Sequence, residues 1–191
     1  MSPLIPVTTS RIGEHLPLLD LLPNQQQLSW VRGGEGLIGW GVHATTTVSG
    51  RDRFEDARKW WHQQLETFSI SNSVHGSGTG PVLFTSFSFD RNEESIAVIP
   101  RVIVGKKGEN SWITWIGEGP QPALFDTAPI YSGQNFEWGQ GTLTEQQWES
   151  RVAQAIAKID KSEIEKVVLA RDLIASTNSE IDVRPVLTKL A

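Results

Sequence analysis

The sequence predicts an α+β fold in which antiparallel β-sheets pack together and are flanked by helices. Two observations predict it. Short apolar strand patterns with turn-rich connections fill much of the first 120 residues, and stretches with helical apolar spacing lie among and after them. The chain has 191 residues, 38% of them apolar, which is enough to build the core of a single domain.

The strand patterns favour antiparallel pairing. Residues 27–44 read as two strands around the glycines Gly33, Gly34 and Gly36, where a positive φ is needed. A phosphate-binding loop would need a helix after these glycines, and a second apolar strand pattern follows instead. Residues 95–105 and 111–117 predict a second strand pair joined by a polar turn, and residues 81–90 predict a strand with an irregularity at Thr85–Ser86.

Two amphipathic helices are predicted. Apolar residues recur at helical spacing over residues 51–68, and again from Trp148 to Ile159. Thr144 and Gln147 have the spacing of a capping box at the start of the second helix. The proline- and glycine-rich residues 119–141 before it predict a surface loop.

The end of the chain predicts a buried strand and then an unfinished helix. Residues 164–175 are rich in β-branched side chains and are bounded by polar ones. Asp182 is then a predicted N-cap, Pro185 lies in the first turn, and an apolar stripe runs towards Ala191 without a C-cap signal. We therefore expect the chain to be a fragment that exposes apolar surface and self-associates.

Composition excludes several kinds of function. The net charge is −5 with no dense basic cluster, so a nucleic-acid partner is not expected. Cysteine is absent, which excludes disulfides, a thiol nucleophile and thiolate metal sites. No apolar run approaches the roughly 20 residues that span a bilayer, and no signal peptide is visible, so we expect a cytoplasmic protein with no membrane partner. The eight tryptophans predict core packing rather than a ligand-stacking surface.

Five segments in order resemble the chorismate-binding enzyme family that serves menaquinone, siderophore and tryptophan biosynthesis. The resemblance rests on residues 30–41, 81–90 and 99–104, the helix with Trp148 and Val152, and residues 164–171, which read IEKVVLAR. It implies that residues 1–191 are the amino-terminal part of a single chorismate-binding catalytic domain. Two glycines common in the family are replaced here by Thr85–Ser86.

Lys166 is the candidate catalytic residue. On a strand it shares a face with Val168 and Ala170, and burial beside apolar neighbours disfavours the charged amine and so creates a usable base. The pattern alone also fits a surface lysine whose stem lies along apolar neighbours. The resemblance favours the first interpretation, because isochorismate and salicylate synthases similarly carry a lysine base here, whereas anthranilate synthases commonly carry glutamine.

The resemblance implies an isochorismate synthase. Lys166 would activate water for attack at carbon 2 of chorismate, with loss of the carbon 4 hydroxyl. In the family, the general acid, the glutamates that hold Mg²⁺ and the residues that hold the substrate carboxylates lie beyond Ala191, so none is assigned. Two alternatives stay open: a salicylate synthase, and a non-catalytic module that binds a ligand or partner.

Overall fold

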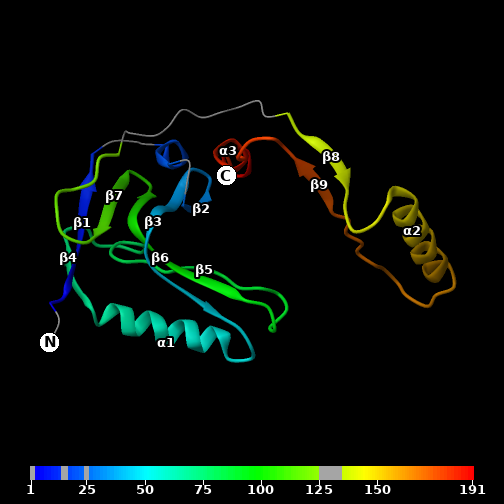
Figure 1. Cartoon of the computed structure of the whole chain (residues 1–191), viewed down its shortest axis with the longest axis horizontal. Coiled ribbons are helices and arrows are strands. Elements are labelled where there is room, and N and C mark those ends of the chain that lie inside the picture. Colours follow the sequence, from blue (N-terminus) through cyan, green and yellow to red (C-terminus); the bar gives the residue numbers. More distant parts are fainter. Residues whose placement is uncertain (1–2, 14–16, 24–25, 125–134) are drawn as a thin grey trace. The chain divides into compact units, whose positions relative to one another are not determined.

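The computed structural model describes residues 3–13, 17–23, 26–124 and 135–191, and the chain divides into two compact units. The first, here called the sheet unit, comprises Met1–Ile130 with Val183–Ala191. The second, here called the α2 unit, comprises Tyr131–Asp182. Helices and strands mix in the described residues, as an α+β fold requires (Figure 1).

A seven-stranded sheet is the centre of the sheet unit. Its strands follow the order β2-β3-β6-β7-β1-β4, and β5 pairs with β6 as well. The sheet is mixed, because β1 pairs in parallel with β4 while the other pairs are antiparallel. The expectation of antiparallel sheets packed together is therefore corrected to one mixed sheet in this unit. The strands are β1 (Ile5–Ile12), β2 (Gln27–Arg32), β3 (Glu35–Val48), β4 (Phe68–Asn72), β5 (Phe84–Ser86), β6 (Ser95–Lys107) and β7 (Asn110–Ile116).

The predicted β2–β3 hairpin is confirmed. Gly33 and Gly34 have φ values of +59° and +76° in the turn, a conformation that L-residues with a side chain rarely adopt. Gly36 has φ +131°, and a Cβ on it would lie 2.0 Å from the carbonyl oxygen of Trp30. The turn and the first cross-strand contact therefore both require glycine.

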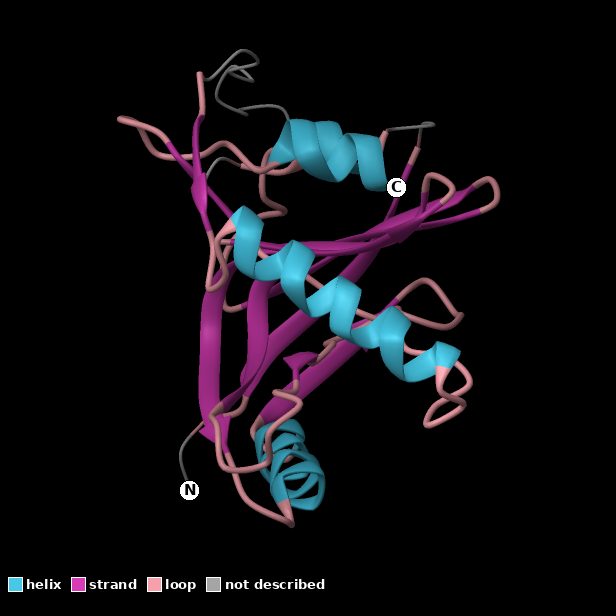
Figure 2. Ribbon diagram, turned by 90° about the vertical axis from the view of Figure 1, so that its right-hand side faces the viewer, coloured by secondary structure: helices cyan, strands magenta, loops and turns pink. Residues whose placement is uncertain are grey.

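One face of the sheet is covered by α1 (Arg53–Leu65), the helix predicted over residues 51–68. Figures 1 and 2 show it below the long strands. Trp60 and Trp61 of α1 pack against the cluster that contains Ile99 of β6, and alternation along β6 places Ile103 on the same face. This face buries two clusters: Val7, Phe68, Ile99 and Ile116 beside α1, and Leu37, Val74, Ile103 and Trp112 further along the strands.

The opposite face is covered by the short 3₁₀ helix η1 (Leu18–Leu21) and by α3 (Arg184–Leu190). Leucines of η1 pack on Ile38, Val102, Val104 and Ile113, and Leu187 of α3 packs against the same cluster. The fully buried Arg184 donates a hydrogen bond from its guanidinium to the carbonyl oxygen of Leu22, at 3.3 Å. The last helix is thus confirmed, but its N-cap is Val183 and not Asp182.

Two strands depart from their predicted form. The strand expected over residues 81–90 is limited to β5, which pairs only with residues 96–98 of β6. In β3 the register shifts between Val42 and Ala44, a bulge that the sequence pattern did not predict. The strands predicted over residues 95–105 and 111–117 are confirmed as β6 and β7, and they pair through residues 102–107 and 110–115.

The α2 unit is a helix beside a two-stranded ribbon. Its elements are β8 (Glu137–Gln140), α2 (Glu145–Asp160) and β9 (Leu173–Ser176), and β8 pairs antiparallel with β9. The capping box is confirmed, since Thr144 and Gln147 each accept a hydrogen bond from the other's backbone N–H. The loop expected over residues 119–141 lies partly outside the described residues, and its end forms β8. None of residues 135–182 is buried.

No helix in the described ranges is long and apolar enough to cross a membrane.

Candidate functional site

Lys166 lies in an irregular segment between α2 and β9. Its side chain is exposed, and Val168, which was expected to share its face, is 93% exposed. The prediction of a buried strand over residues 164–175 is therefore wrong for this chain: only Leu173–Ser176 is a strand, and that strand is not buried. The expected water-poor environment of Lys166 is not formed by the described residues.

The physical reason is the lack of a pairing neighbour. A β-strand forms when its backbone groups bond to an adjacent strand, and β-branched residues indicate only that a segment suits such a place. β9 pairs with β8 along four residues. Residues 164–172 pair with no strand in the described part of the chain. The apolar run that carries Lys166 therefore remains exposed.

A local clamp holds the end of this segment. The Asp172 carboxylate accepts hydrogen bonds from the backbone N–H and the hydroxyl of Thr142, with distances of 3.0 Å. These bonds, chiefly that from the backbone N–H, hold the pKa of Asp172 below its ordinary value. Gly141 allows the approach, because a Cβ on it would lie 2.4 Å from the Asp172 carboxyl carbon. The carboxylate is thus occupied in fixing the junction between β8 and β9.

The candidate metal chemistry has no counterpart in the described residues. No group of three or more histidine or carboxylate side chains there is arranged to hold a metal ion. Glu165 is exposed in the irregular segment, and Asp172 is engaged with Thr142. Neither residue has the carboxylate neighbours that a Mg²⁺ site needs.

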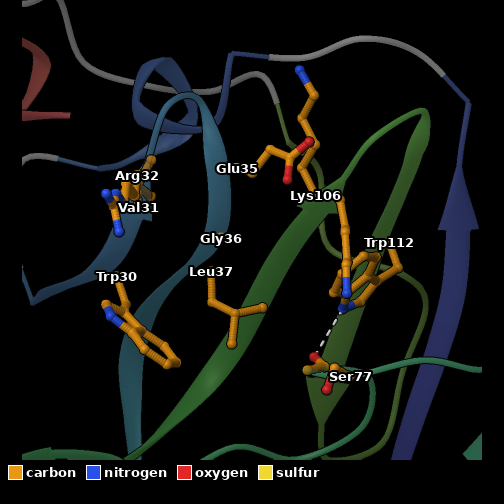
Figure 3. A pocket seen from close by; sticks show the side chains of 11 residues that line it. Trp30, Val31, Arg32, Glu35, Gly36, Leu37, Ser77, Lys106 and Trp112 are labelled. Carbon is orange, nitrogen blue, oxygen red and sulfur yellow. Dashed lines mark hydrogen bonds between the residues drawn. The ribbon is translucent and has the colours of Figure 1, made fainter.

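A groove of about 480 Å³ lies on the sheet unit, on the face that α1 covers further along the strands. Four residues in register cross the sheet beneath it: Trp30, Leu37, Gly105 and Trp112. Figure 3 shows Trp30 and Trp112 on either side of Leu37, with Glu35 and Lys106 towards the strand ends. Two further hollows adjoin it, one sharing Trp30 and Leu37, the other sharing Ser77, Lys107 and Trp112.

The sequence did not predict this groove. The tryptophans were expected to fill a core, and Trp112 does so, but Trp30 is 77% exposed. The alternation Trp30–Arg32 on one strand and Glu35–Leu37 on the next was the available signal, because it places these four side chains on one face of the hairpin.

A family model described as "Chorismate binding enzyme" matches residues 17–116 and 129–191, most of the chain. A curated relative, "Isochorismate synthase MenF" of Bacillus subtilis (strain 168), is 24% identical over an alignment of length 184, and the match covers 81% of this chain and 39% of the relative. The chain thus spans about two fifths of the length of that relative. No solved structure matches. The expected resemblance is confirmed by the extent of the family match, and the chain belongs to the chorismate-binding enzyme family.

Proposed function

We propose that the complete protein is an isochorismate synthase and that Lys166 is its general base. The observation that carries this proposal is the family match over residues 129–191, which includes Lys166, together with the name of the curated relative. The substrate would be chorismate, as the family's description implies.

The proposed reaction exchanges one hydroxyl position for another. A neutral Lys166 amine removes a proton from water while the water oxygen bonds to carbon 2 of chorismate. Both ring double bonds shift, the bond from carbon 4 to its hydroxyl breaks, and a general acid protonates the departing oxygen, so that one water enters and one leaves. The described residues supply a candidate for the base, and we assign no acid.

The exposure of Lys166 sets a condition on this role. Water around a lysine favours the charged ammonium form, and removal of that water favours the neutral amine that a general base needs. We infer that the active protein covers residues 164–172 with further polypeptide that also removes water from the amine. Val167, Val168 and Leu169 on the same segment are all exposed here and would be buried by that cover.

Magnesium belongs to the proposal only for the complete protein. The described residues do not fit a Mg²⁺ site, because they lack a carboxylate cluster and Asp172 is held by Thr142. No step above therefore depends on the metal.

The test compares two lysines of one segment in the full-length protein. Lys166→Ala should reduce kcat for isochorismate formation by at least about a thousandfold, because the base acts in the chemical step. Lys161→Ala, five residues away and also exposed, should keep wild-type kcat. Chromatography of the products separates isochorismate from salicylate, which a salicylate synthase would release with pyruvate. Wild-type kcat in Lys166→Ala would remove the residue from its proposed role.

The 191-residue chain provides a second arm of the test. Because its Lys166 is exposed and no acid is assigned, the purified chain should give no isochorismate from chorismate and Mg²⁺. Measurable turnover by this chain would contradict the need for a cover.

A further inference from the structure

We propose that the groove between Trp30 and Trp112 binds a planar ring carboxylate. The groove lies on the sheet unit, whereas Lys166 lies on the α2 unit. The inference does not depend on the proposed catalytic role of Lys166, because it rests on the residues that line the groove.

The register of the sheet builds the floor and one wall. Adjacent strands lie about 4.8 Å apart, so Trp30, Leu37, Gly105 and Trp112 stand in a row across four strands. A Cβ on Gly105 would lie 2.3 Å from two atoms of the Trp112 indole, so the ring of Trp112 lies over this glycine. Leu37 is then the floor between two indoles.

The wall at Trp112 is fixed before any ligand arrives. The Trp112 indole N–H donates a hydrogen bond to the carbonyl oxygen of Gly78, at 3.0 Å. Gly78 itself has φ +83°, and a Cβ on it would lie 3.1 Å from the Leu37 side chain and 3.5 Å from the Trp112 indole. Asn72 ties the same loop down, donating to the Thr79 hydroxyl and accepting from the N–H of Val74, both at 3.0 Å. A preformed wall lowers the ordering cost of binding.

The opposite wall is an unused aromatic face. Trp30 is 77% exposed on β2, the edge strand of the sheet, where nothing in the described residues covers most of its ring. An indole face attracts flat rings through stacking and buries their apolar area. Figure 3 shows the Trp30 ring directed towards the Leu37 side of the groove.

Charge at the groove favours an anion. Arg32, Lys106 and Lys107 line it, and the one lining carboxylate, Glu35, accepts a hydrogen bond from the backbone N–H of Gly108 at 2.8 Å. The three cations thus outnumber the one acid here, although the whole chain has a net charge of −5. None of these three cations forms an ion pair with a carboxylate of the described residues.

Spacing assigns the carboxylate to the Arg32 end. Arg32 is two residues from Trp30 on the same strand face, about 7 Å along β2, so its long side chain can reach an anion attached to a ring stacked on Trp30. A guanidinium matches a carboxylate with two parallel hydrogen bonds. A volume of about 480 Å³ suits a single substituted ring. A ring of this size with a carboxylate at one edge could therefore stack on Trp30 and bind the Arg32 guanidinium at the same time.

The test titrates the 191-residue chain with benzoate and with benzamide, its uncharged analogue, and follows the indole N–H signals by NMR. Benzoate should shift the Trp30 and Trp112 signals saturably, and benzamide should bind at least about fivefold more weakly. Trp30→Ala should weaken benzoate binding about tenfold, the loss expected for one stacked ring. Trp138→Ala is the matched control, because Trp138 is 70% exposed on the other unit, and it should leave the affinity unchanged.

Charge variants complete the test. Arg32→Gln should remove most of the preference for benzoate over benzamide, and Lys161→Gln, an exposed cation at the end of α2, should leave it intact. All of these side chains are partly or fully exposed, and the circular dichroism spectrum of each variant should match the parent. The absence of saturable benzoate binding, equal affinity for the two ligands, or undiminished benzoate affinity in Trp30→Ala would each overturn the proposal. None of these measurements requires catalysis. A negative result would therefore contradict binding in the groove without bearing on the proposed isochorismate synthase activity.

Discussion

The two units of this chain contain similar kinds of apolar residues but bury them to different extents. In the sheet unit, apolar side chains are buried on both faces of one sheet, under α1 on one side and under η1 and α3 on the other. In the α2 unit, none of residues 135–182 is buried, although Trp138, Val168, Leu173 and Ile174 all lie there. Burial therefore depends on having a second layer to pack against, and a favourable pattern is not sufficient.

The α2 unit is held by local polar contacts instead of a core. The capping box at Thr144 closes the start of α2, and the Asp172–Thr142 clamp fixes the junction of β8 and β9. Such contacts at the surface compete with hydrogen bonds to water, so they contribute little to ordering a segment of this size. The exposed apolar surface makes self-association of the 191-residue chain a continuing prediction, to be measured by sedimentation.

The largest expected difference between the units concerns their isoleucines. Ile103 is fully buried in β6, and Ile103→Ala should lower the free energy of unfolding of the sheet unit by about 2–5 kcal/mol, because it removes apolar contacts and leaves a cavity. Ile174 is 53% exposed in β9, and Ile174→Ala should change the free energy of unfolding of the α2 unit by less than about 0.5 kcal/mol. Urea unfolding followed by tryptophan fluorescence measures both. Equal losses in the two variants would mean that the α2 unit has a core of its own.

Glycine substitutions sharpen the comparison on a smaller scale. A Cβ on Gly105 meets the Trp112 indole at 2.3 Å, so Gly105→Ala should cost about 1–3 kcal/mol through overpacking and should alter the Trp112 indole signal. Gly139 is also in a strand, but a Cβ there would have its first neighbour at 3.9 Å. Gly139→Ala should therefore leave the unfolding midpoint within error of the parent. A destabilised Gly139→Ala protein would show that β8 is packed more tightly than its surroundings indicate.

The sequence predicted the elements that local interactions determine. The Gly33–Gly34 turn, the Thr144 capping box and the stripe of α1 each depend on residues close together in the chain, and all three are confirmed. The parallel pairing of β1 with β4 could not be predicted in the same way, because it joins residues more than 60 positions apart.

The candidate site was predicted less well than the fold. A strand with a buried lysine at residues 164–175 needs neighbouring strands, and the local pattern contains no information on whether this chain supplies them. The groove at Trp30 was not predicted, because the local pattern does not show where a strand lies in the sheet. A tryptophan in an amphipathic strand reads as core, and its exposure follows from the place of β2 at the edge of the sheet.

The smallest expected effect is a pH dependence confined to the α2 unit. Hydrogen bonds from Thr142 lower the pKa of Asp172 in the folded state, so the clamp contributes stability above the ordinary carboxyl pKa of about 3.9 and loses it as the pH falls through the lowered folded value. The Thr142 amide signal should therefore stay constant from neutral pH down to about pH 4 and shift only in more acidic solution. Asp172→Asn should abolish this titration, whereas Asp160→Asn, which changes a carboxylate at the last residue of α2, should preserve it.

Since the clamp lies entirely within the α2 unit, the urea midpoint of the sheet unit should be the same in both variants at neutral pH. A common shift of that midpoint in Asp172→Asn would mean that the two units unfold as one, and the contrast between a buried and an exposed half would then not describe how this chain is stabilised.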